Sequence, residues 1–419
     1  MFAQLFPKSR YTQKRLERGP LAEDRRRYLR YRAAQQMAPV TLRSMAFYTL
    51  AVAKTLRLAD RPGELITYQE IDAAVERWVH RKPTRRATRS FGHARKAFWS
   101  HAIRWLRFLG RLQLPAAVPR PYAREVTQYS NYQLQERGLS PHTVAYSSRT
   151  LHEFLGQVRQ AGLRLKGLRA GQVDELLAQK IHEQGYARRT IKRWADVLRV
   201  FLRFAEDRHW CRPGLAAAIM APRVFRQESL PVGPSWQDVQ RLLAAAEGPE
   251  PVQVRDRALL MLLAVYGLRA GEVTTLCVQD FDWERELLHV LHGKSWRPRT
   301  YPLCRPVGDA VLRYLQQVRP QTERREVFWS LVAPFRPLTT WALGSLVQRR
   351  LRALKLTLPH YGPHALRHAC ATHLLAQGLS LKEIGDHLGH RSPDATRIYA
   401  KVDLTALRAV ADFSLEGLL

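Results

Sequence analysis

Residues 361–402 carry a set of side chains suited to chemistry on a phosphate. His364 and Arg367 stand three residues apart, His390 directly follows a glycine, and Tyr399 comes nine residues later. An arginine offers a planar fork of donors that matches phosphoryl oxygens, and a histidine can shuttle protons near neutral pH. A tyrosine hydroxyl has a pKa of about 10, so it attacks poorly without such neighbours. The set therefore indicates a tyrosine that attacks a phosphate.

Local signals predict three short helices that could bring these side chains together. The first helix is expected from about Pro363 to Gln377, with a glycine placed to end it. Ser380-Leu-Lys-Glu383 is a capping box, and it opens a second helix that should stop at Gly389. Ser392-Pro393-Asp394 is expected to open a third helix, with Tyr399 about two turns into it.

The motif HALRH followed by LGHRSPDATRIY resembles the C-terminal signature of the tyrosine recombinase (phage integrase) family. Upstream, YGLRAGEVTTL supplies Arg269 at the place of the family's first catalytic arginine. The predicted hairpin HVLHGKSWRPRTYPL supplies Lys294 at the place of the family's hairpin lysine. All six positions are present in the family's order and spacing, and the resemblance covers roughly residues 121–405.

The resemblance implies a division of labour among the six residues. Tyr399 would attack a DNA phosphodiester and form a 3′-phosphotyrosyl link, which conserves the bond energy and needs no ATP. Arg269 and Arg367 would clamp the non-bridging oxygens and stabilise the charge of the transition state. The resemblance assigns protonation of the leaving 5′-oxygen to Lys294, assistance of the tyrosine to His364, and a hydrogen bond to the phosphate to His390.

The spacing of the histidines also permits a metal site. His364 and His368 are four residues apart, and His387 and His390 are three apart. However, no HExxH glutamate accompanies the first pair, and no CxxC motif supports a structural zinc. For magnesium, residues 361–402 offer only three carboxylates, Glu383, Asp386 and Asp394. We therefore expect no metal and no other cofactor, with the arginines and the lysine supplying the positive charge.

The charge balance points to a polyanionic partner. The 419 residues include 68 Lys and Arg against 36 Asp and Glu, a formal net charge of +32. Residues 1–120 alone hold 26 basic and 8 acidic residues, which is more than half of the excess. Double-stranded DNA is the natural partner, although basic runs can also be solvated helix faces. The candidate DNA-binding residues are Arg85, Arg86 and Arg89, followed by Arg188, Arg189, Lys192 and Arg193.

The predicted fold is mainly α, with two helical DNA-binding domains before a mostly helical catalytic domain that contains a small antiparallel β-hairpin or sheet. The motif at 38–42 resembles that at 140–144, which favours a duplicated helical module. Proline-rich stretches at 114–121 and 222–235 are typical of linkers. The expected domains are a basic N-terminal DNA-binding domain at 1–115, a core-binding, SAM-like domain at 121–225 and a catalytic domain at 236–419. The N-terminal domain could be an arm-binding module or a duplicated core-binding module.

The C-terminal tail shows apolar residues at helical spacing, from Leu404 to Leu418. This stripe could pack on its own domain. By resemblance to the family, we expect it to dock on a neighbouring subunit and to build a tetramer on DNA that carries specific recombination sites.

Two further patterns bear on the compartment. No apolar run approaches the roughly 20 residues that span a bilayer, and the N-terminus lacks the pattern of a signal peptide. The four cysteines show no disulfide-framework spacing. We expect a cytoplasmic, nucleoid-associated protein without a membrane partner.

Three functions compete on this sequence. The first is a site-specific recombinase, the integrase or transposase of a mobile genetic element. The second is a type IB topoisomerase-like enzyme, which shares the chemistry but relaxes supercoils. The third is a non-catalytic DNA-binding accessory protein. The amphipathic tail and the helical segment at 121–225 favour recombination, and the complete set of six residues argues against an accessory protein.

Overall fold

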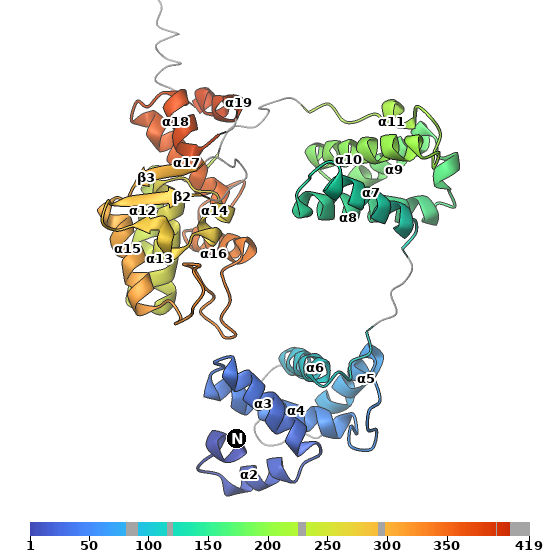
Figure 1. Ribbon diagram of the computed structural model, residues 1–419, viewed down its shortest axis with the longest axis vertical. Coiled ribbons are helices and arrows are strands. Elements are labelled where there is room, and N and C mark those ends of the chain that lie inside the picture. The colour runs from blue at the N-terminus through green and yellow to red at the C-terminus, as the bar shows by residue number, and fades with distance from the viewer. Residues whose placement is uncertain (81–90, 115–119, 225–231, 292–297, 391, 403–419) are drawn as a thin grey trace, which may run out of the picture. The chain divides into compact units, whose positions relative to one another are not determined.

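The computed structural model describes residues 1–80, 91–114, 120–224, 232–291, 298–390 and 392–402 (Figure 1). It is mostly helical with one three-stranded antiparallel sheet, which confirms the predicted fold class. The chain divides into two compact units, Ala116–Glu228 and the remainder. The three-domain division with its boundaries stays a prediction. Within the described ranges, no helix is both long enough and apolar enough to cross a lipid bilayer.

The N-terminal segment forms helices around a hydrophobic core of its own, in which Leu50, Trp105 and Leu106 are buried. Local signals set the helix starts: a proline lies in the first turn of α4, and Thr67 and Glu70 form a reciprocal capping box before α5. The helices are α1 (Phe2–Leu5), α2 (Arg10–Glu17), α3 (Ala22–Ala34), α4 (Pro39–Thr55), α5 (Tyr68–Val79) and α6 (Phe91–Phe108).

All the regular elements of the segment at 120–224 are helices, as predicted. Ser140 caps α8 by accepting a hydrogen bond from the Thr143 backbone N–H, and an apolar stripe along that helix, from Val144 to Val158, is buried. The helices are α7 (Ala123–Gln135), α8 (Pro141–Gln160), η1 (Leu165–Gly167), α9 (Ala170–His182), α10 (Arg188–Asp207) and α11 (Leu215–Ala218).

The two related motifs occupy equivalent places in the secondary structure. Residues 38–42 open α4 and residues 140–144 open α8, each with a proline in the first turn. Each segment also contains a later long helix, α6, which ends at Phe108, and α10, which ends at Asp207. Whether the segments arose by duplication stays a prediction.

The C-terminal segment builds the largest core around α13, whose central residues are buried on all sides. The sheet has the order β1-β2-β3, and Leu288 of β2 pairs with Tyr301 of β3. The elements up to the signature are α12 (Trp236–Ala245), α13 (Pro251–Val265), α14 (Ala270–Thr275), η2 (Val278–Asp280), β1 (Phe281–Asp282), β2 (Leu287–Val290), β3 (Arg299–Pro302), α15 (Arg305–Gln317) and α16 (Thr340–Ala353).

The first two helices of the signature are confirmed. They are α17 (Pro363–Ala376) and α18 (Leu381–Leu388). The Ser380–Glu383 capping box is formed, and Gly389 ends α18 in the left-handed conformation with φ of 65°.

The prediction for the third helix is wrong in its length. α19 covers only Asp394–Arg397, and the chain then tightens into a 3₁₀ helix, η3 (Ile398–Val402). Tyr399 therefore lies on η3 and not two turns into an α-helix. This winding places its ring in a small apolar core with Cys370, Ile384 and Leu388.

Candidate active site

Arg367 is a buried cation at the centre of the signature. Arg367 is 2% exposed, and its side chain bridges two turns of the chain, at Gly267 and at Leu388. Nη1 donates to the Gly267 carbonyl at 2.6 Å and Nη2 donates to the Leu388 carbonyl at 2.7 Å. Burial, followed by the charge of Arg269, lowers the pKa of Arg367 to about 10. The guanidinium therefore remains charged at neutral pH and is held by carbonyl oxygens that leave its charge uncompensated.

Arg269 is fixed by a buried carboxylate from the first turn of the next helix. Glu272 accepts hydrogen bonds from the Arg269 backbone N–H at 2.8 Å and from Nη1 at 2.9 Å, and Nη2 donates to the Gly389 carbonyl at 3.0 Å. Burial would raise the pKa of Glu272. The backbone hydrogen bond and the charges of Arg299 and Arg269 outweigh burial, so the pKa lies below its ordinary value.

The two arginines and one histidine line a common pocket of about 440 Å³. His364 opens α17 and is exposed to this pocket, with Thr340 and Glu272 also in the wall. The structure thus brings together three of the predicted residues, Arg269, His364 and Arg367. A pocket lined by two guanidinium groups is suited to an anion with two free oxygens, such as the non-bridging oxygens of a phosphodiester.

His390 lies on the turn after α18, as predicted. Its Nδ1 is 2.7 Å from the Thr396 hydroxyl, which fixes the orientation of the ring. Burial, followed by the charges of Arg367 and Arg269, lowers the pKa of His390 to about 4. The imidazole is therefore neutral at pH 7, and one of its nitrogens carries a proton that it can donate.

Tyr399 is buried, and its hydroxyl lies 2.9 Å from Nδ1 of His368. It is not among the residues that line the 440 Å³ pocket. Burial raises the pKa of Tyr399 to about 12. Burial, followed by the charges of His364 and Arg367, lowers the pKa of His368 to about 4, so the ring is neutral and can accept the phenolic proton.

His368 is the functional candidate that sequence reasoning missed. From the sequence, His368 is only a possible metal partner of His364, and the family resemblance assigns the assistance of the tyrosine to His364. In the structure, the His364 ring packs edge-on against the His368 ring at 4.4 Å, and His368 makes the contact with the tyrosine. The available signal was its position four residues after His364, on the same face of a predicted helix.

Two family models match the chain. The phage integrase family model matches residues 235–405, and the model of the phage integrase N-terminal SAM-like domain matches residues 126–209. The tyrosine recombinase XerC of Alcanivorax borkumensis is 34% identical over 298 residues, which cover 68% of this chain and 92% of the relative. The chain belongs to the phage integrase family.

A second relative extends over more of this tyrosine recombinase. The integrase/recombinase y4rF of Sinorhizobium fredii (strain NBRC 101917 / NGR234), whose name is provisional, is 30% identical over 377 residues, covering 88% of this chain and 86% of the relative. Because 377 residues exceed the span of the two family models, this similarity reaches beyond the SAM-like and catalytic segments.

Solved structures share the fold of the recombinase. The XerH site-specific recombinase bound to palindromic difH substrate has a TM-score of 0.53 at 19% identity, covering 71% of this chain and 91% of that chain. A lambda integrase dimer bound to a COC′ core site has a TM-score of 0.51 at 18% identity, covering 66% and 94%. At this level of identity the likeness concerns the fold alone.

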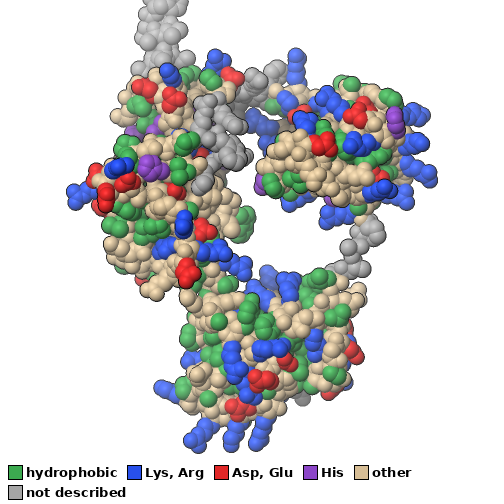
Figure 2. Space-filling model, viewed as in Figure 1, with side chains coloured by type: hydrophobic (Ala, Val, Ile, Leu, Met, Phe, Trp, Pro, Cys, Tyr) green, Lys and Arg blue, Asp and Glu red, His purple; other side chains and the backbone are tan. Residues whose placement is uncertain are grey.

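The remaining predicted residues of the recombinase fall into two groups. Arg188, Arg189, Lys192 and Arg193 are exposed in the first turns of α10, whose opposite face is buried. Figure 2 shows basic side chains spread over the surface of the helices α7–α11 in this view. Lys294 and the N-terminal candidates Arg85, Arg86 and Arg89 lie outside the described residues. β2 and β3, which precede and follow Lys294 in the sequence, form the predicted antiparallel pair.

In the described part of the recombinase, no three or more His, Cys, Asp or Glu side chains lie together so that they could hold a metal ion. The histidines of the signature instead contact side chains of the site: His368 contacts Tyr399, and His390 contacts Thr396.

Proposed function

We propose that this tyrosine recombinase is the integrase or transposase of a mobile genetic element, and that it cuts and rejoins specific sites in double-stranded DNA. One observation supports the proposal above all others. Two guanidinium groups, from Arg269 and Arg367, share one pocket, and the signature that supplies Arg367 also holds the hydroxyl of Tyr399 on a neutral imidazole. These are the parts that a phosphoryl transfer through a tyrosine requires.

In the proposed reaction, the Tyr399 oxygen attacks the phosphorus and its proton passes to Nδ1 of His368. The bond from phosphorus to the 5′-oxygen breaks, and Lys294 supplies the proton that this oxygen needs to leave. Arg269 and Arg367 hold the two non-bridging oxygens and stabilise the charge that builds on them. Rejoining runs the same steps in reverse with a 5′-hydroxyl from a partner strand.

The buried position of Tyr399 adds one requirement to this mechanism. The tyrosine is 2% exposed and does not line the pocket that holds the two arginines. The short α19 and η3 must therefore shift when DNA binds, so that the hydroxyl reaches the phosphorus. Two one-turn elements and a small apolar core are a modest barrier to such a shift, because little surface has to be uncovered.

A covalent-adduct assay tests the function and separates the three candidate activities. We expect the protein to form an SDS-resistant adduct with a nicked duplex of its target site, and the Tyr399→Phe variant to form none. The products decide between the enzymes: strand exchange between two sites indicates recombination, whereas relaxation of any supercoiled circle indicates a topoisomerase. Absence of any adduct on a site that the protein demonstrably binds would leave an accessory protein.

We also propose that the recombinase assembles as a tetramer on paired sites through residues 403–419, which lie outside the described part of the chain. The support is the apolar spacing of that tail. A chain ending at Val402 should bind one site normally but give complexes with fewer than four protomers on paired sites, as measured by light scattering. Four protomers of the shortened chain would contradict the role of the tail.

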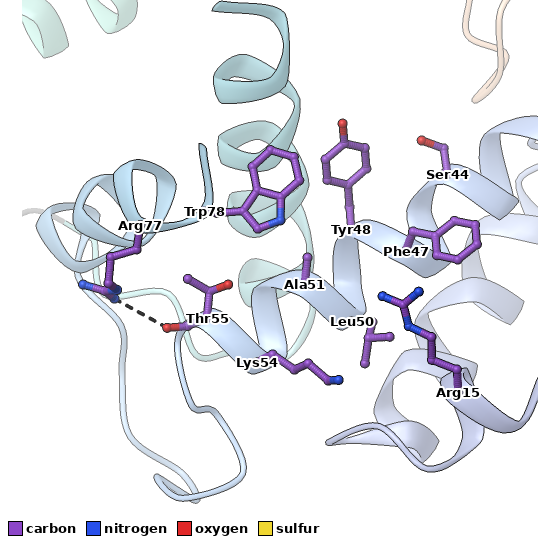
Figure 3. Close-up of a pocket in the computed structure, with 10 residues that line it drawn as sticks. All are labelled: Arg15, Ser44, Phe47, Tyr48, Leu50, Ala51, Lys54, Thr55, Arg77 and Trp78. Carbon is purple, nitrogen blue, oxygen red and sulfur yellow. Dashed lines mark hydrogen bonds between the residues drawn. The ribbon is translucent and has the colours of Figure 1, made fainter. Parts of the chain in front are cut away.

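The N-terminal helices are proposed to contact DNA outside the core site. They enclose a pocket of about 540 Å³ whose rim carries Arg15, Lys54 and Arg77 from three different helices (Figure 3). Phe47, Tyr48 and Trp78 supply aromatic surface, and none of the ten lining residues is acidic. Protein surfaces that bind nucleic acids typically place cations, which contact phosphates, beside aromatic rings, which contact sugars or bases. We propose that the recombinase, with DNA as its substrate, acts in the cytoplasm in association with the nucleoid.

A further inference from the structure

Arg299 is a largely buried arginine that none of the proposed steps uses. It is the first residue of β3, and its side chain is 11% exposed. Nη2 lies 2.7 Å from Oε1 of Glu272, and Nη1 donates to the Tyr301 hydroxyl at 2.6 Å and to the His387 carbonyl at 3.4 Å. A guanidinium withdrawn from water and bound to three different elements is a fixed part of the scaffold.

The contact with Glu272 connects Arg299 to Arg269, which is proposed to bind the phosphate. The same oxygen, Oε1 of Glu272, forms an ion pair with Nη2 of Arg299 at 2.7 Å and accepts a hydrogen bond from Nη1 of Arg269 at 2.9 Å. The carboxylate is 1% exposed, so its orientation depends on these partners and on the Arg269 backbone N–H. With two cations sharing one buried carboxylate, Arg269 is aligned without having its charge fully neutralised.

Arg299 also supports the pocket through a second set of contacts, with the turn after α18. The Arg299 guanidinium packs so closely on Gly389 that a Cβ at that position would lie 2.7 Å from Cζ. The carbonyls of this turn receive both arginines of the pocket, because Leu388 accepts from Arg367 and Gly389 accepts from Arg269. Arg299 therefore supports the backbone that holds both guanidinium groups.

The geometry points to Arg299 as a positioning residue: it holds Arg269 in the orientation that binds the phosphate, through Glu272 and the Gly389 turn. This inference rests on the proposed function and deepens it, since Arg299 does not touch the pocket and acts only through other residues. Two substitutions separate its features. Arg299→Lys keeps the positive charge but loses the planar fork, and Arg299→Gln loses the charge as well.

Single-turnover cleavage of a nicked target duplex is the first measurement. We expect Arg299→Lys to slow cleavage about 100-fold, the effect of a misplacement of about 1 Å in a catalytic group. Arg305→Gln is the matched control, because this arginine in the same segment is 92% exposed and only loosely paired with Asp309. Equal rates for the Arg299→Lys and Arg305→Gln variants would overturn the inference.

A double-mutant cycle tests whether Arg299 acts through Arg269. If it does, adding Arg299→Lys to an Arg269→Lys chain should change the rate by no more than a few-fold, because the group being positioned is already lost. Independent, multiplying effects would overturn the inference. Thermal unfolding of each variant separates lost positioning from lost folding, and Arg299→Lys supplies the readout if Arg299→Gln does not fold.

A sulfur-substituted substrate distinguishes the arginines from the general acid. When sulfur replaces the leaving 5′-oxygen, departure no longer needs a proton, so a Lys294→Ala variant should regain most of its rate. The Arg299 variants should stay slow, since the non-bridging oxygens are unchanged. Recovery of Arg299→Lys on this substrate would show that it acts through the hairpin instead. A wild-type protein that forms no adduct would refute the proposed function itself, which is a different outcome.

Discussion

At the residue scale, the site keeps its arginines charged and its histidines neutral, although both kinds of side chain are shielded from water. Arg367 keeps its charge although it is 2% exposed, because backbone carbonyls bind it. Burial is the main reason that the pKa values of His368 and His390 are low and both rings are neutral; the charge of His364 for the first ring and of Arg367 for both adds to it. The arginines are therefore suited to binding an anion, and the imidazoles to accepting or donating a proton.

The contact between His368 and the tyrosine gives the prediction for this scale. His368→Ala should lower the cleavage rate about 100-fold or more, the usual range for a lost general base. Because the pKa of His368 is about 4, the base form persists as the pH falls to about 5 and is lost as the pH falls through about 4. The second-order rate of cleavage should therefore not decline between pH 8 and pH 6 through protonation of this ring.

The control is His182→Ala, an exposed histidine at the end of α9 that should cleave normally. Wild-type rates for a folded His368→Ala variant would contradict the role of this residue. A loss of activity centred near pH 6.5 would instead indicate a histidine with an ordinary pKa.

At the scale of elements, a single turn organises the pocket. Gly389 ends α18, its carbonyl accepts from Arg269, and the preceding carbonyl accepts from Arg367. The left-handed φ of 65° explains why glycine is preferred here, and the close approach of Arg299 leaves no space for a side chain. A short turn between α18 and α19 thus fixes the positions of groups from three separate elements.

Substitution of this glycine tests the importance of the turn. Gly389→Ala should destabilise the C-terminal segment by about 1 kcal/mol or more, because alanine is strained at positive φ and its Cβ would displace Arg299. Cleavage should slow at the same time. Gly344→Ala is the control: that glycine lies within α16 with nothing within 4 Å of an added Cβ, so the change should be neutral or stabilising. Denaturant unfolding of both variants measures the difference, and equal stabilities would contradict the argument.

At the scale of the whole molecule, the excess of positive charge favours long contacts with DNA. The net charge is +32, and more than half of the excess is in the first 120 residues. Basic side chains without carboxylate partners release counterions from DNA when they bind phosphates, which makes the affinity depend steeply on salt. The pocket of the N-terminal helices supplies three such cations, Arg15, Lys54 and Arg77, which form no ion pair with a carboxylate of the described residues.

Neutralising this pocket tests the N-terminal DNA contact. A chain with Arg15, Lys54 and Arg77 all changed to Gln should show a slope of log affinity against log salt that is shallower by about 2 to 3. The control changes Arg26, Arg27 and Arg30 to Gln, because these arginines of α3 pair with Glu23 or Asp24 on their own helix. Equal slopes for the two triple variants, measured by fluorescence anisotropy, would place the DNA contact elsewhere.

Much of the local structure was predictable from sequence, because short-range signals decide it. The capping box at Ser380, the stop at Gly389 and the burial of the stripe along α8 all depend on neighbours within a few residues. The order and spacing of the six signature residues likewise indicated the family and its chemistry. The prediction for the third signature helix was wrong in its length, because packing of the Tyr399 ring, and not local propensity, sets the winding of this segment.

Other features of the site were decided only by the tertiary structure. His368 stands beside the tyrosine, and Glu272 lies between two arginines that are 30 residues apart in the sequence. The contacts of His368 with Tyr399 and of Glu272 with Arg299 do not follow from spacing, because a contact between distant segments depends on how helices and strands pack around a common core. The sequence by itself determined which groups are present and which helices carry them. The fold decided which imidazole holds the tyrosine and which arginine supports the pocket.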